Sequence, residues 1–266
     1  MDFRRIEMIF LFVFIALNVF LGISFFQSQQ VDLATDAGGT TAILADIKRD
    51  DIKLPKLSTS TEHGAYLAST KTSTLRQDVG PVKGQTLHFS DANGLTLNAT
   101  LDSPLSVKTN AAARLQRWVA QADNVAHGSA YTYQKELSTA TSYVFAQKIG
   151  GHLVNDPHAQ LTLHVSDGRL TGYAQTYLTN LVTLRGDVNL CSAQDAVTTL
   201  YRENEITSNS KVLWTHLSYT YLLNAKGSTV YVPAWSVGIE SQGSKNLTVK
   251  KVNAINKTVL KTRSED

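Results

Sequence analysis

The longest apolar run of the chain extends from Ile6 to Phe26. After Glu7 it contains no ionisable side chain, and apolar residues occupy every face of the helix that it predicts. At a rise of about 1.5 Å per residue such a helix is roughly 31 Å long, close to the hydrocarbon thickness of a bilayer. The pattern therefore predicts a transmembrane helix rather than a buried core helix.

A cleaved signal peptide is the alternative interpretation of this run. Its apolar region would be shorter, about 7 to 15 residues, with small residues after it, whereas Phe25 to Gln27 follow here. Arg4 and Arg5 precede the run, and basic residues of this kind stay in the cytoplasm. We therefore expect an uncleaved single-pass anchor in the cell membrane, with a cytoplasmic tip (1–5), a transmembrane helix (6–26) and an extracellular C-terminal region.

Residues 27–54 are interpreted as a linker and a juxtamembrane helix. Gln27 to about Gly39 is polar and rich in small residues, which is typical of a linker. Thr41 is a suitable N-cap for a short helix through Ile52, and Pro55 would stop that helix.

Residues 55–186 predict a first extracellular α+β module. Up to Thr74 the pattern is weak, with at most one short strand at 65–68. Period-two alternation then predicts a hairpin with its turn at Asp91 to Gly94. Helical spacing predicts a helix over 111–122, with Leu115 and Val119 facing the core. Further strands are expected at 131–134, 142–149, 160–166 and 170–178, and Asp167-Gly168 joins the last two as a hairpin turn.

Residues 187–266 repeat this order of elements and predict a second module. Ser192 and Asp195 have the spacing of a capping box before a helix whose apolar positions recur at i, i+3, i+4 and i+7. Three strand-like runs follow, and Pro233 within the middle run indicates a sheet edge, a bulge or a strand end. The predicted fold class is α+β, with two modules that each place a helix on an antiparallel sheet.

Composition adds two constraints. A formal charge of +3 over 266 residues is too small to indicate a nucleic-acid partner. Cys191 is the only cysteine, so the chain forms no intramolecular disulfide.

No motif indicates catalysis, a metal or a cofactor. His152, His158 and His164 recur every six residues, but their strand-rich setting gives no way to bring them together. Asp156 and Asp167 are conceivable as paired acids for glycan hydrolysis, yet both lie in loops beside turn residues. We therefore expect a protein that is not an enzyme.

Aromatic residues gather in the C-terminal strands and have two interpretations. They form either a sugar- or peptide-binding platform or ordinary cross-strand packing, and packing is favoured. These residues are Trp214, Tyr219, Tyr221, Tyr231 and Trp235.

Four segments together resemble one known family. They are MDFRRIEMIFLFVFIALNVFLG, IKLPKLSTSTEHGAYLAS, VYVPAWSVGIE and VNAINKTVL. They are similar to the YycI family of Gram-positive bacteria, and the ending also resembles PepSY-type modules, although Asn256-Lys257 stands where a glycine is common. The resemblance implies a YycH-like extracellular fold and a membrane-anchored accessory protein. It further implies association with YycH and with the sensor histidine kinase WalK (YycG), whose activity the family adjusts.

One stripe of the N-terminal helix is suited to contacting such a partner. Asn18 offers an amide for an interhelical hydrogen bond, and Gly22 permits close approach one turn later. The alternative is that Asn18 bonds only to its own helix backbone. The full stripe is Leu11, Ile15, Asn18, Gly22 and Phe25.

Three classes of function are considered at this point. The exported region is either a regulator that works through its helix or a module that senses wall fragments or peptides through its aromatic residues. An anchored wall hydrolase is a third class, for which no motif is present. The sequence also leaves open the sign of regulation and whether the outer domains form homodimers or heterodimers.

Overall fold

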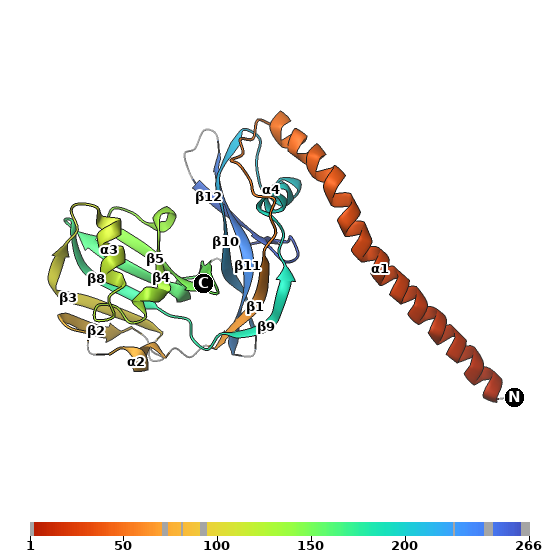
Figure 1. The fold of residues 1–266 in the computed structure, drawn as a ribbon, viewed down its shortest axis with the longest axis horizontal. Helices are drawn as coiled ribbons and strands as arrows, with labels where there is room; N and C mark the ends of the chain where they lie inside the picture. Colours follow the sequence, from red (N-terminus) through yellow and green to blue (C-terminus); the bar gives the residue numbers. More distant parts are fainter. Residues whose placement is uncertain are drawn as a thin grey trace.

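The structure is a computed structural model, and it describes residues 3–70, 74–80, 82–90, 95–225, 227–241 and 247–261. Within these ranges the side chains of residues 3–6, 24–38, 70, 185 and 187 are not described. Figure 1 shows a long helix, α1, that leads from the N-terminus to a body made of two sheets.

Four α-helices lie in the described ranges: α1 (Phe3–Arg49), α2 (Leu75–Asp78), α3 (Ala111–Val119) and α4 (Ala193–Arg202). Three 3-10 turns are η1 (Gly128–Ala130), η2 (Lys135–Leu137) and η3 (Pro157–Ala159). The strands of the first half are β1 (His63–Thr70), β2 (Gln85–Phe89), β3 (Thr96–Ser106), β4 (Tyr131–Gln134), β5 (Ser142–Ile149) and β6 (His152–Val154). The remaining strands are β7 (Gln160–Ser166), β8 (Arg169–Thr176), β9 (Val182–Asn189), β10 (Ser210–Ala225), β11 (Ser228–Ser241), β12 (Leu247–Asn253) and β13 (Val259–Leu260).

Sheet B is the antiparallel sheet β4-β5-β7-β8-β3-β2, and α3 covers one of its faces. The predicted hairpin and the four later strands of this module are confirmed, and their inward side chains meet Leu115 and Val119 of α3 in one core. Asp167 and Gly168 both have positive φ, as the tight β7-β8 turn requires. The predicted turn at 91–94 lies outside the described residues.

Sheet A contains β13-β12-β11-β10-β6, with β1 and β9 joined to it through β11. All of its pairs are antiparallel except that of β10 with β6. α4 packs on one face of this sheet and begins with the predicted capping box. The Ser192 N–H donates to the Asp195 carboxylate, and the Asp195 N–H donates to Ser192 Oγ. A short β5-β6 hairpin connects sheet A to sheet B.

Pro233 lies at neither a bulge nor a strand end, but one side of β11 has no partner strand at this residue, so the expected edge is present locally. β11 pairs with β10 along both sides of Pro233, so the proline lies within the strand. The other neighbour of β11 changes at this point, from β1 at Ser228–Tyr231 to β12 at Ala234–Glu240. The missing N–H therefore falls in the gap between two partner strands, where no ladder bond is lost.

The expected linker and separate juxtamembrane helix are replaced by one continuous helix. α1 runs through residues 27–39 without a break and ends at Arg49, before Pro55. Asp51 has a φ of 53°, Ile52 N–H donates to the Ile47 carbonyl (3.1 Å), and Asp51 N–H donates to the Lys48 carbonyl (3.2 Å). This Schellman arrangement brings Ile47 and Ile52 together in the core, so it ends the helix instead of the proline.

The modules also divide the chain differently from the expected boundary. β1 was expected as a weak strand within the first module, but it pairs with β9 and β11 of sheet A. The core around α4 likewise contains Ile47 and Ile52 from the end of α1. By contrast, every described member of the sheet B core lies between Leu75 and Tyr177. Sheet B is therefore inserted between β1 and β9 of sheet A.

Candidate functional site: the apolar helix and the polar junction of the two sheets

The N-terminal part of α1 presents large apolar side chains that no other part of the described chain covers. Exposed positions surround the helix between Met8 and Ile23 and include Leu11 at 54% and Ile15 at 48% exposure. In Figure 1 this part of α1 projects away from both sheets. Over the residues that the structure describes, no helix has the length and apolarity that a membrane crossing requires.

The predicted stripe lies on this exposed part of α1. Asn18 Nδ2 donates to the Phe14 carbonyl at 2.8 Å, so this amide bonds to its own helix backbone, as one interpretation of the sequence expected. A Cβ added at Gly22 would meet no atom within 4 Å, so another helix could approach the backbone closely there. The side chain of Phe25 lies outside the described residues.

The other end of α1 is fixed in the body of the protein. Ile43, Leu44 and Ile47 pack against the core that α4 shares with sheet A. Tyr201 of α4 donates from Oη to Asp50 Oδ2 at 2.8 Å, and this bond to a carboxylate is the main cause that raises the Tyr201 pKa. The backbone of Lys53 then bonds to Ser210 and Val212 of β10. The exposed apolar part of α1 is thus connected to sheet A by an unbroken helix.

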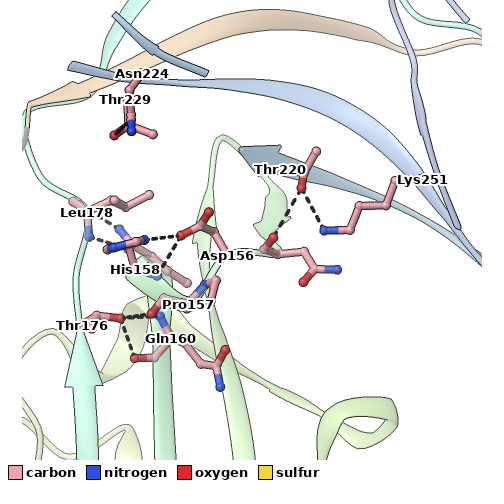
Figure 2. A network of polar contacts seen from close by, with 12 residues as sticks. Asp156, Pro157, His158, Gln160, Thr176, Leu178, Thr220, Asn224, Thr229 and Lys251 are labelled. Carbon is pink, nitrogen blue, oxygen red and sulfur yellow. Dashed lines mark hydrogen bonds and ion pairs between the residues drawn. The ribbon is translucent and has the colours of Figure 1, made fainter. Parts of the chain in front are cut away.

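A chain of polar contacts joins the two sheets, as Figure 2 shows. Lys251 Nζ of β12 donates to Thr220 Oγ1 of β10 at 2.9 Å. Asn155, directly after β6, donates its N–H to the Tyr219 carbonyl at 2.7 Å. Asp156 accepts from the backbone N–H and the ring Nδ1 of His158, both at 2.8 Å. The Asn155 bond joins the end of β6 to β10, while the Lys251 and Asp156 bonds lie on either side of this contact.

Lys251 is a cation of this junction whose pKa is lowered. Desolvation by burial lowers its pKa, and the nearby Asp156 carboxylate opposes that effect. Burying an ammonium group costs free energy unless charged and polar partners surround it. Thr220 and Asp156 provide such partners, so we interpret the junction as a positioning network.

The junction does not have the geometry of an activated nucleophile. Ser218 and Ser236 lie on adjacent strands of sheet A, are buried, and have hydroxyls with no hydrogen-bond partner among the described residues. Ser236 stands opposite Lys251 in the β11-β12 register, yet no hydrogen bond joins them. Nucleophilic catalysis requires a base bonded to the hydroxyl, and none is placed here.

The other candidate residues from the sequence do not converge. His158 bonds to Asp156, His152 lies 3.9 Å from a Glu62 carboxylate oxygen, and His164 is exposed on β7. Asp156 and Asp167 lie at opposite ends of β7, so they do not form a carboxylate pair. The described ranges contain no cluster of three or more potential metal ligands.

The aromatic residues of the C-terminal strands are divided among three places. Trp235 is buried in the core beneath α4, where its Nε1 donates to the Cys191 carbonyl at 2.8 Å. Tyr219, Tyr221 and Tyr231 belong to the small core between the sheets. Trp214 lies over Gly238, where an added Cβ would stand 2.6 Å from its Nε1. The arrangement favours packing over a single binding platform.

Together these features define a class of protein: a sheet-dominated α+β domain fixed to the end of a long helix whose far part is apolar and uncovered. The model of the YycI family matches residues 32–255, which is most of the chain, so the chain belongs to the YycI family. This is a family of regulators associated with the WalK/YycG two-component system, and it is not a family of enzymes. The resemblance seen in the sequence is therefore confirmed at the level of the family.

Solved structures give weaker likenesses. An uncharacterised protein from Eubacterium rectale ATCC 33656 is 9% identical, with 80% of this chain and 92% of that chain covered and a TM-score of 0.45. The C-terminal domain of Bacillus megaterium YpeB is 12% identical, with 86% and 98% covered and a TM-score of 0.35. No curated protein matches the sequence significantly.

Proposed function

We propose that this chain is a non-enzymatic, membrane-anchored regulator of the WalK/YycG sensor histidine kinase. In this proposal residues 6–26 of α1 cross the cell membrane once, with the N-terminus in the cytoplasm and both sheets outside. The stripe of Leu11, Ile15, Asn18, Gly22 and Phe25 contacts the transmembrane helices of the kinase or of a YycH-like partner.

One observation carries the proposal: the uncovered apolar part of α1 continues without a break into the core of sheet A. A helix this apolar on all faces needs a nonaqueous surrounding, and lipid supplies it. Within lipid, close packing and interhelical hydrogen bonds drive association. Gly22 permits close packing, and the side-chain Oδ1 of Asn18 can accept an interhelical hydrogen bond. Differential contact with two kinase states would shift their equilibrium by about 1 to 3 kcal/mol.

Cysteine crosslinking in membranes tests the contact face. With Cys191→Ala as background, cysteines placed at Leu11, Ile15 and Gly22 should crosslink efficiently to the kinase or the YycH-like partner. Val13, Ala16 and Phe20 lie on the opposite face of the helix and are matched controls. Crosslinks that are absent, or equally strong on both faces, would contradict the proposed stripe.

The second function considered from the sequence, sensing through an aromatic platform, receives no such support. Trp214, Tyr219 and Trp235 lie in separate packing environments. No described observation favours that platform over the regulatory function.

A further inference from the structure

A groove of about 530 Å³ runs along the outer face of α3, at the side of the body that lies away from α1 in Figure 1. Its volume falls within the range of about 300 to 1,000 Å³ that is usual for small-molecule sites. The lining residues include Leu105, Asn110, Arg114, Arg117, Trp118 and Gln121. Arg114, Arg117 and Trp118 belong to α3, whereas Asn110 and Gln121 flank its two ends, and all five line the groove.

Arg114 and Arg117 give the groove a positive charge. Arg114 and Arg117 are exposed, and neither forms an ion pair with a carboxylate in the described part of the chain. From Ser103 to Ala122 the sequence contains Lys108 and these two arginines but no acidic residue. Arg117 Nε donates to the Ala113 carbonyl at 3.3 Å, which leaves both terminal nitrogens of that guanidinium for a ligand.

Two amides of the groove are also available. Asn110 precedes α3 with a φ of 49°, and its side chain makes no capping hydrogen bond, although capping is the usual role of an asparagine there. Gln121 accepts a bond from Asn124 at its Oε1, which leaves its NH₂ group for another acceptor. Gln116, on the opposite side of α3, has both ends of its amide bonded to β4. Among the described polar side chains of α3 and its two ends, those with donors left for a ligand thus lie on the groove side.

Trp118 supplies a fixed aromatic wall. Its ring meets the buried Tyr173 ring edge to face, with centroids 6.0 Å apart and planes at 68°. The indole packs against the sheet B core and also lines the groove, so packing holds it in place before any ligand arrives. Aromatic side chains of this kind bury the apolar faces of flat or ring-shaped groups.

We propose that the α3 groove binds a phosphorylated sugar. Guanidinium groups bind phosphate through paired N–H donors, and two of them on successive turns can hold one phosphate. The Asn110 and Gln121 amides then bond to sugar hydroxyls, while Trp118 covers a face of the ring. This site lies on sheet B, away from α1, and it is independent of the proposed regulatory contact.

Calorimetric titration of the full-length chain in a non-ionic detergent tests the site, with glucose 1-phosphate as the probe. Inorganic phosphate and glucose are titrated separately under the same conditions. Glucose 1-phosphate should bind at least about tenfold more tightly than either part alone, because phosphate and ring contacts are made together. The double variant R114Q/R117Q should weaken this binding by at least about tenfold.

The double variant K53Q/K211Q is a matched control, because it removes the same charge from exposed positions on sheet A. Its affinity should equal that of the unmodified chain. R114K/R117K keeps the charge without the planar fork and should bind with intermediate affinity. No binding by the unmodified chain, an equal affinity for inorganic phosphate, or an equal loss in K53Q/K211Q would each overturn the proposal.

Discussion

The surroundings of an individual side chain in this protein depend on which residues the fold places beside it. Lys251 is an ordinary lysine in the sequence, on a strand that begins in a polar stretch. In the structure its ammonium group bonds to Thr220 of β10 and is partly buried, which lowers its pKa. Its neighbour Lys250 points elsewhere and pairs with Glu205 at 2.6 Å. Two adjacent lysines, both partly buried, therefore have different partners.

The lowered Lys251 pKa predicts a specific dependence of stability on pH. At pH values between the pKa of Lys251 in the folded chain and its usual value of 10.5, the unfolded chain binds more protons than the folded chain. The free energy of unfolding therefore increases as the pH rises through this range. Lys251→Met removes this contribution. We expect K251M to lie within about 1 kcal/mol of the unmodified chain at neutral pH. As the pH rises to about 10, K251M should become less stable than the unmodified chain by a growing margin.

Denaturant unfolding at a series of pH values measures this difference. Lys250→Met is the control on the same strand, and it should show no comparable increase in the advantage of the unmodified chain. A difference between K251M and the unmodified chain that stays constant with pH would show that Lys251 is well hydrated.

At the scale of elements, α1 differs most from what the sequence predicted. Small and polar residues between Gln27 and Gly39 are typical of a linker, yet α1 continues through them, including Gly38 and Gly39, and no proline interrupts it. The fixed end at Ile47 and Ile52 supplies a folded template on which the helix extends. α1 thus runs unbroken from the apolar stripe to the sheet A core.

Insertions into α1 between residues 30 and 36 test this coupling. Two added alanines rotate the stripe by about 200° relative to sheet A, whereas seven added alanines, about two turns, nearly restore its direction. If the proposed regulation of the kinase depends on this orientation, the two-residue insertion should abolish the effect on kinase output in cells, and the seven-residue insertion should retain much of it. Equal activity of both variants, at matched protein levels, would indicate a flexible connection instead.

At the scale of the whole molecule, the chain forms sheet A from three separated segments: β1, the short β6, and β9 to β13. β1 leaves sheet A, the complete sheet B module follows, and β9 returns beside β1, where Ala68 pairs with Val182. The small core of Leu67, Val154 and Tyr231 then seals the contact between the sheets. Sheet B has its own core, whereas sheet A depends on residues before and after the insertion.

Fragments of the chain should reflect this arrangement. Residues 74–178 contain the described sheet B core and should unfold cooperatively by themselves. Residues 187–266 alone lack β1 and the end of α1, so they should not fold. Joining residues 40–70 to residues 182–261 through a short glycine-serine linker should restore folding, because β1 and β9 are neighbours. Circular dichroism melts distinguish these outcomes, and a cooperative melt of 187–266 alone would contradict the inserted topology.

The sequence by itself determined the local elements and the family. Period-two alternation located the β2-β3 hairpin, strand-like runs located the other strands of sheet B and β10, β11 and β12, and the Ser192-Asp195 spacing located the start of α4. These signals depend on neighbours a few residues away. Nothing local indicates that Pro233 stands where β1 gives way to β12, or that the aromatic cluster is divided.

Only the tertiary structure decided the remaining features. The pairing of β1 with β9, the packing of the α1 end beneath α4 and the desolvation of Lys251 all arise from contacts between residues far apart in the chain. The groove beside α3 had a partial signal, since Arg114 and Arg117 lie in a stretch without acids. Its shape required the fold, because Leu105 of β3 and the packed Trp118 complete its walls. Local sequence patterns determine which element forms, whereas burial and charge balance depend on which elements meet.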